Sequence, residues 1–177
     1  METLRILFDR VDMKITRWLS RYSLTILRVG LGVVFLWFGA LKFFPGLSPA
    51  QELAVRTIET LTLGLIPAGT GLMLLAALEC AIGVLLIWGR FMRFTLLLLL
   101  FQMFGAASPL VLFPGEAFNV FPYAPTLEGQ YIIKNIVLVA GGLVIGSTVR
   151  GGRLVAEPDE AGLGERDAAP RRLERSL

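Results

Sequence analysis

Four long apolar runs, separated by short polar segments, dominate the pattern of hydrophobic and polar positions along the chain. The runs cover residues 23–44, 71–88, 91–112 and 131–148. With a rise of about 1.5 Å per residue, a helix of about 20 apolar residues crosses the hydrocarbon core of a bilayer. The pattern therefore predicts an all-α, polytopic membrane protein, built as an antiparallel bundle of four transmembrane helices.

The segments on either side of this bundle have different patterns. In residues 1–22, apolar side chains recur every three or four positions, and basic side chains recur on another face. This arrangement is typical of an amphipathic helix lying in the headgroup plane, although a helix packed on the bundle is the alternative. Residues 150–177 are rich in Arg, Glu, Ala and Gly, so we expect a disordered tail. The bundle itself then occupies residues 23–149.

The two longer connections have patterns of their own. Ala50, Ala54 and Ile58 recur at helical spacing after Ser48, whose side-chain oxygen is placed to cap a helix. We therefore expect a short amphipathic helix on the membrane surface between the first two spans. Residues 113–130 combine prolines with aromatic residues, which indicates an aromatic loop at the membrane interface.

Basic residues are distributed unevenly between the two sides of the predicted bundle. One side carries Arg5, Arg10, Lys14, Arg17, Arg21, Arg90, Arg93, Arg150 and Arg153. The loops of the other side carry only Arg56. Because Lys and Arg are enriched in cytoplasmic loops, we expect both termini in the cytoplasm.

Composition narrows the function classes. The chain is 55% hydrophobic, with a mean hydropathy of +0.69, and its basic residues are explained by topology, so nucleic acid is not an expected partner. The sequence contains no His and a single cysteine, Cys80. A C-x-x-C redox pair is therefore impossible, and we expect no metal site. Cys80 lies in an apolar run, where we expect a small packing residue.

One face of the first span carries two cations. Arg28, Gly32, Phe35, Gly39 and Lys42 recur every three or four residues, which places them on one side of a helix. A cation in lipid costs several kcal/mol, so this face should turn toward other helices. For Lys42, extension to the outer headgroups is the alternative.

Three polar residues lie deeper in the predicted spans. Arg28 is roughly 8 Å and Glu79 roughly 14 Å above the inner boundary, and Gln102 lies near the middle of the third span. We therefore expect Arg28, Glu79 and Gln102 to converge on one cavity in the inner half of the bundle. An ion pair between Arg28 and Glu79 that only fixes helix register is one alternative, and no direct contact between the two residues is another. Lys42, Lys134 and Asn135 are expected near the outer boundary.

Small residues predict where the helices pack closely. Gly142 and Gly146, like Ala77 and Ala81, are four residues apart, a spacing that lets two membrane helices approach. We expect both pairs to face another helix. Pro109 should kink or loosen the end of the third span.

Three runs resemble the DoxX-like superfamily of small four-span membrane proteins. They are RVGLGVVFLWFGALKF, LECAIGVLLIWGRFMR and GQYIIKNIVLVAGGLVIG. The first is particularly similar to the branch that contains the reactive-chlorine-resistance membrane protein. The resemblance covers residues 24–150. It transfers the family's positions to Arg28, Gly32, Gly39, Lys42, Glu79, Gly83, Lys134 and Asn135.

The resemblance implies a cellular location and a kind of partner, but no particular reaction. Some members are the membrane subunit of thiosulfate:quinone oxidoreductase, and others are linked to oxidative-stress resistance. It therefore implies an integral protein of the bacterial inner (plasma) membrane, with the lipid bilayer and a soluble redox enzyme as partners. Because the sequence has no metal-binding cluster and no redox cysteine pair, we expect a protein that is not catalytic alone, and a homo-oligomer stays open. No catalytic residue is assigned, because a shared fold does not define a reaction.

Three functions are compatible with these features. The first is a redox- or oxidative-stress-associated subunit that binds a quinone or lipid-like ligand between helices. Arg28, Glu79 and Gln102 would bind the headgroup, and Phe35 and Trp37 would form aromatic walls. The second is a membrane scaffold that recruits a soluble partner. The third is a small proton-coupled transporter, for which four spans leave little room unless the protein oligomerises.

Overall fold

The computed structural model of the protein describes residues 2–44, 46–48 and 50–156. Most of the predicted tail, residues 157–177, lies outside these ranges. Ile26–Arg150 form one compact unit, and the helical segment before Ile26 belongs to a second unit. The bundle and the candidate site lie within Ile26–Arg150.

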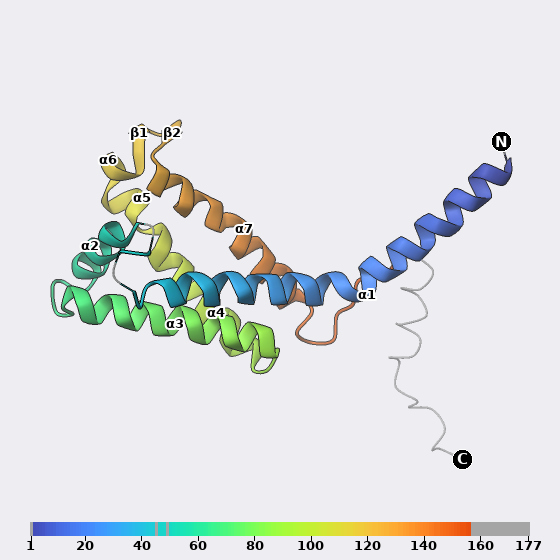
Figure 1. Ribbon diagram of the computed structural model, residues 1–177, viewed down its shortest axis with the longest axis horizontal. Helices are drawn as coiled ribbons and strands as arrows, with labels where there is room; N and C mark the ends of the chain where they lie inside the picture. Colours follow the sequence, from blue (N-terminus) through green and yellow to red (C-terminus); the bar gives the residue numbers. More distant parts are fainter. Residues whose placement is uncertain (1, 45, 49, 157–177) are drawn as a thin grey trace, which may run out of the picture. The chain divides into compact units, whose positions relative to one another are not determined.

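The described part of the chain is mainly helical (Figure 1). In chain order, the elements are α1 (Glu2–Leu41), α2 (Gln51–Leu61), α3 (Ala68–Trp88), α4 (Met92–Ala107), α5 (Pro109–Leu112), α6 (Pro114–Ala117), β1 (Phe118–Val120), β2 (Ala124–Pro125) and α7 (Leu127–Ser147). The strands β1 and β2 form a small antiparallel hairpin within the predicted aromatic loop.

Four helical segments of the described chain are long and apolar enough to cross a membrane. They are Phe8–Leu41, Ala68–Trp88, Met92–Leu112 and Leu127–Ser147. The predicted all-α polytopic architecture is confirmed. Because α1 is one continuous helix from Glu2 to Leu41, no break separates residues 2–22 from the first span. The placement of residues 1–22 in the headgroup plane stays a prediction.

Turns and helix ends follow from a few residues. Gly89, with a φ of 77°, ends α3, since glycine adopts this left-handed conformation without strain. Pro109 lacks a backbone N–H, and the third span is divided there into α4 and α5, as predicted.

The predicted cap of α2 is wrong: Ala50, not Ser48, precedes the helix, and no side chain caps it. The Gln51 side chain instead accepts a hydrogen bond from the Gly46 N–H.

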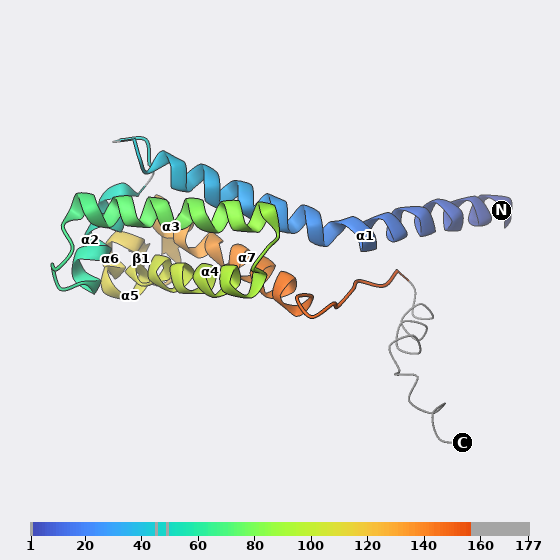
Figure 2. The same ribbon diagram turned by 90° about the horizontal axis from the view of Figure 1, so that it is seen from below.

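Within the unit Ile26–Arg150, α3, α4 and α7 run alongside one another, with α2, α5 and α6 gathered at one end (Figures 1 and 2). The buried apolar core draws on all four spans: Leu31, Phe35, Ile82, Leu86, Leu99, Met103 and Ile145. Many large apolar side chains face outward from the same helices. In a bilayer this outer surface contacts lipid, so close packing rather than apolar burial must hold the helices together.

Glycines provide that close packing between α1 and α3. A Cβ on Gly83 would lie 2.6 Å from the Leu36 backbone nitrogen, and one on Gly32 would lie 2.9 Å from the Gly83 carbonyl oxygen. A Cβ on Gly39 would lie 2.9 Å from the Cys80 nitrogen. The two backbones therefore touch along the predicted glycine face of α1.

The predicted packing of small residues against another helix is confirmed for α7 but not for α3. A Cβ on Gly142 would lie 3.3 Å from a Leu99 methyl, and one on Gly146 would lie 3.4 Å from a Leu96 methyl. Both glycines therefore face α4, as predicted. The prediction for Ala77 and Ala81 is wrong, because both are exposed on the bundle surface. The side of α3 that packs inward instead carries Ala76, Glu79 and Gly83.

Candidate functional site

Three polar side chains from three spans form a connected network inside the bundle. Lys42, just beyond the last residue of α1, donates from Nζ to Glu79 Oε2 at 2.6 Å. Gln102 of α4 donates from Nε2 to Glu79 Oε1 at 2.8 Å. Each oxygen of the Glu79 carboxylate therefore accepts a hydrogen bond from a different segment: one from the residue that follows α1, the other from α4.

The network is almost closed to the surroundings. Glu79 is 6% exposed and Gln102 is 7% exposed, and the Lys42 side chain is 13% exposed. A charge in this environment needs a compensating partner, and removing one member of a buried pair typically costs about 3–5 kcal/mol. The ion pair between Lys42 and Glu79 therefore makes the two charges tolerable in the apolar bundle.

The amide oxygen of Gln102 has no hydrogen-bond partner in the described part of the chain. Oε1 is buried, and none of the described residues donates to it. The orientation of the amide follows from chemistry, because an ionised carboxylate only accepts hydrogen bonds and must face the amide NH₂. A buried acceptor without a partner costs about 1–3 kcal/mol. Gln102 Oε1 is therefore a ready acceptor for a hydrogen-bond donor.

Lys42 also keeps donor capacity. Its ammonium group has three N–H donors, of which one goes to Glu79 and another to the Phe38 carbonyl oxygen at 3.3 Å. The network thus combines a further donor on Lys42 with a further acceptor on Gln102. The Lys42 ammonium and the Gln102 amide are hydrogen-bonded to the two oxygens of the Glu79 carboxylate, so they lie near each other.

The geometry of α1 explains why Lys42 reaches inward. Side chains of a helix lean toward its N-terminus, so a lysine at the C-terminal end points back along the helix. Gly39, less than one turn earlier, lets α1 touch α3 beside Glu79 and Cys80. The predicted depth of Lys42, near the outer boundary, did not indicate Glu79 as its partner. The predicted helix face of Lys42, turned toward the other helices, agrees with this contact.

Arg28 has a different role, and its predicted pairing with Glu79 is wrong. It donates from Nη1 to the carbonyl oxygens of Leu86 at 2.7 Å and Ile87 at 3.2 Å. These carbonyls belong to the last turn of α3, where the helix dipole favours a cation. Like Lys42, Arg28 leans toward the N-terminus of α1, which carries it away from Glu79. The predicted meeting of Glu79 with Gln102 is confirmed, but without Arg28.

Phe35 and Trp37, the predicted aromatic walls of the ligand site, lie on different sides of α1. Phe35 is 4% exposed and packs in the core, on the α1 face that meets α3. Trp37 is 65% exposed, because a shift of two residues turns a helical side chain by about 200°. Trp37 therefore faces outward and does not line the network.

Lys134 and Asn135 lie apart from the network, on α7. Lys134 is exposed, with Nζ 5.8 Å from the centre of the Tyr131 ring. Asn135 is half-buried. No hydrogen bond joins either residue to Lys42, Glu79 or Gln102 within the described part of the chain.

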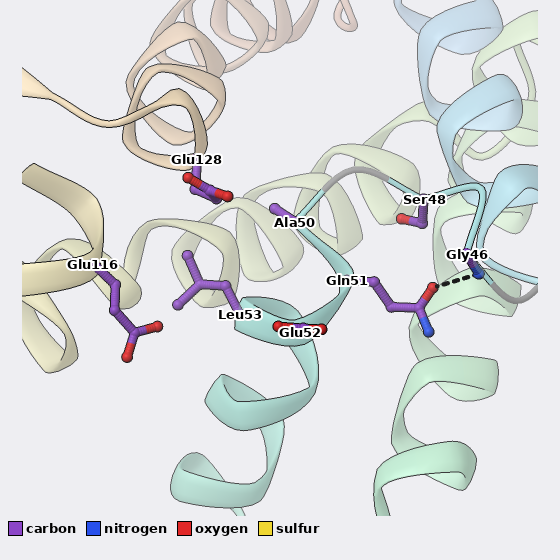
Figure 3. A pocket seen from close by; sticks show the side chains of 8 residues that line it. All are labelled: Gly46, Ser48, Ala50, Gln51, Glu52, Leu53, Glu116 and Glu128. Atoms are coloured by element: carbon purple, nitrogen blue, oxygen red, sulfur yellow. Dashed lines mark hydrogen bonds between the residues drawn. The ribbon is translucent and has the colours of Figure 1, made fainter.

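An acidic cavity of about 550 Å³ lies where α2 meets the segment before α7 (Figure 3). Its lining consists of Gly46, Ser48, Ala50, Gln51, Glu52, Leu53, Glu116 and Glu128. Glu52 and Glu128 occupy the first turns of α2 and α7, where helix dipoles favour acids. Glu116 forms an ion pair with Arg56. The sequence did not predict this cavity, because the three carboxylates come from separate segments.

The four spans and their buried ion pair define a small, polytopic helical membrane protein with a polar centre. A sequence model of the DoxX family matches residues 23–113, more than half of the chain, and the chain belongs to the DoxX family. The match includes Arg28, Lys42, Glu79 and Gln102, whereas α7 lies beyond it. No curated protein and no solved structure matched the chain.

Proposed function

We propose that this DoxX family protein is a redox- or oxidative-stress-associated membrane subunit that binds a quinol or quinone at the Lys42–Glu79–Gln102 network. The observation that supports this most directly is the buried amide oxygen of Gln102, which no described residue satisfies. A quinol hydroxyl can donate to that oxygen, and a quinone carbonyl can accept from Lys42. The same network therefore suits both forms of the ligand.

The surroundings also suit a lipid-soluble ligand. The network lies in a helical bundle whose outer surface is apolar, so a ligand dissolved in the bilayer can approach from the membrane. An ion pair inside a membrane bundle is costly, and such residues are a default indication of function. Lys42, whose side chain is the most exposed of the three, then faces the arriving headgroup.

Electrons would have to come from elsewhere. The sequence has no His and one Cys, so it offers few ligands for a redox cofactor. We therefore propose a soluble redox enzyme as the partner that exchanges electrons with the bound ligand. In this arrangement the DoxX protein binds and orients the ligand and is not catalytic alone.

Binding of a short-chain quinol to the purified full-length protein tests this proposal. Decylubiquinol would be titrated into protein in nanodiscs, and bound ligand would be quantified after rapid separation. Gln102→Leu removes the open acceptor and should weaken binding about tenfold, the equivalent of one hydrogen bond. Gln130→Leu is the matched control, because Gln130 is exposed on α7.

Two results would count against the proposal. Equal quinol affinity in wild-type and Gln102→Leu protein would show that the network does not bind the headgroup. Wild-type protein that binds no quinol but retains a soluble protein during purification would favour the scaffold function instead.

A further inference from the structure

A second cavity lies between α4 and α7, at the end of the bundle where α4 begins. Its volume is about 370 Å³, and its lining consists of Arg93, Leu96, Leu97, Leu100, Gly146, Ser147, Val149 and Arg150. None of these residues belongs to the Lys42–Glu79–Gln102 network. The lining has two cations and no carboxylate.

The order of these residues along α4 gives the cavity a polar end and an apolar end. Arg93, Leu97 and Leu100 recur every three or four residues, so they follow one another along a single helix face. Arg150 lies just beyond the end of α7, and therefore at the same bundle end as Arg93. A molecule with a charged head and an apolar chain fits this sequence of groups.

The cavity opens outward from the bundle. Leu97 is 66% exposed and Leu100 is 40% exposed. On the facing helix, Gly146 has no side chain to fill the space beside Leu96. In a membrane, such an apolar groove on the outer surface is accessible to lipid acyl chains.

Charge decides which lipid fits. Arg93 and Arg150 are both exposed, and no hydrogen bond or ion pair joins either guanidinium to another described residue. Guanidinium groups bind phosphate through paired hydrogen bonds. Basic pockets between helices attract anionic lipid headgroups. A zwitterionic headgroup would bring its own cation close to the two arginines.

We propose that this groove is a binding site for one anionic phospholipid. Its phosphate lies between Arg93 and Arg150, and one acyl chain lies along Leu97 and Leu100. The site is independent of any quinol bound at Glu79. The lipid bridges α4 and α7, so its binding should stabilise the contact between these two helices.

Lipid retention by the full-length protein, measured by native mass spectrometry, tests the proposal. The protein would be exchanged into detergent containing phosphatidylglycerol or phosphatidylcholine. We expect one retained phosphatidylglycerol per chain, and at least about tenfold weaker retention in the Arg93→Gln, Arg150→Gln double variant. Ser147→Trp, which fills the groove without changing its charge, should also reduce retention.

Arg90→Gln is the matched control, since Arg90 lies at the same bundle end but its guanidinium packs over the Trp88 ring. It should retain phosphatidylglycerol like wild type. Equal losses in the control and the double variant would overturn the proposal, as would unchanged retention in the double variant. Equal retention of phosphatidylcholine by wild type would also overturn it. Inorganic phosphate that displaces the lipid at equal concentration would show a free-anion site instead.

Discussion

At the scale of single residues, the two cations of α1 stabilise different groups of α3. Arg28 donates to carbonyl oxygens at the end of α3, where the backbone acceptors lack helical partners. Lys42 donates to the Glu79 carboxylate, which also accepts from Gln102. Of the two cations, only Lys42 is paired with a charged group. The Glu79 carboxylate would be costly to bury without this partner. Glu79 and Lys42 should therefore be tightly coupled in stability.

This coupling gives a prediction for single and double replacements. Glu79→Ala leaves Lys42 without its counter-charge and removes the acceptor of the Gln102 amide, so it should destabilise the protein by about 3–5 kcal/mol. The Lys42→Met, Glu79→Leu double variant removes both charges and should lose less. Denaturation in mixed detergent micelles measures both values. A double variant that is less stable than Glu79→Ala would contradict the ion pair.

At the scale of helices, glycine contacts set the distance between α1 and α3. Gly32, Gly39 and Gly83 allow the two backbones to touch. In lipid the apolar effect contributes little to helix association, so van der Waals contact at such points must supply much of the stability. The same contacts hold Lys42 at hydrogen-bonding distance from Glu79.

Two glycine replacements distinguish the effect of lost backbone contact between helices from the effect of helix propensity on stability. A Cβ on Gly83 would collide with the Leu36 backbone, whereas one on Gly30 would meet no described atom within 4 Å beyond the neighbouring backbone of its own helix. Gly83→Ala should therefore destabilise the protein by about 1–3 kcal/mol. Gly30→Ala should be neutral or slightly stabilising, because alanine favours helix over glycine. Thermal unfolding in detergent compares them, and similar melting temperatures would contradict close packing at Gly83.

At the scale of the whole molecule, the sequence predicted the spans well because their hydropathy is unambiguous. It also placed Glu79 opposite Gln102, since both lie near the middle of adjacent antiparallel spans. It assigned the wrong cation to Glu79 because a depth estimate from Cα positions ignores the direction in which long side chains lean. The acidic cavity escaped prediction because loop positions, unlike helix faces, have no simple periodicity.

Topology is the prediction that belongs to the whole molecule. Arg90, Arg93 and Arg150 lie at one end of the bundle, so we expect that end to face the cytoplasm of a bacterial cell. In a Cys80→Ala background, Tyr123→Cys should react with a membrane-impermeant maleimide added outside intact cells. Arg90→Cys should react only after permeabilisation. The reverse labelling pattern would contradict the orientation.

The most direct test of the proposed function is an experimental structure of the protein with decylubiquinol bound. We expect a quinol hydroxyl oxygen at about 2.7–2.8 Å from Gln102 Oε1, and the ring beside the Lys42–Glu79 pair. A quinol bound elsewhere, with Gln102 Oε1 satisfied by another group of the protein, would contradict the assignment of this network as the ligand site.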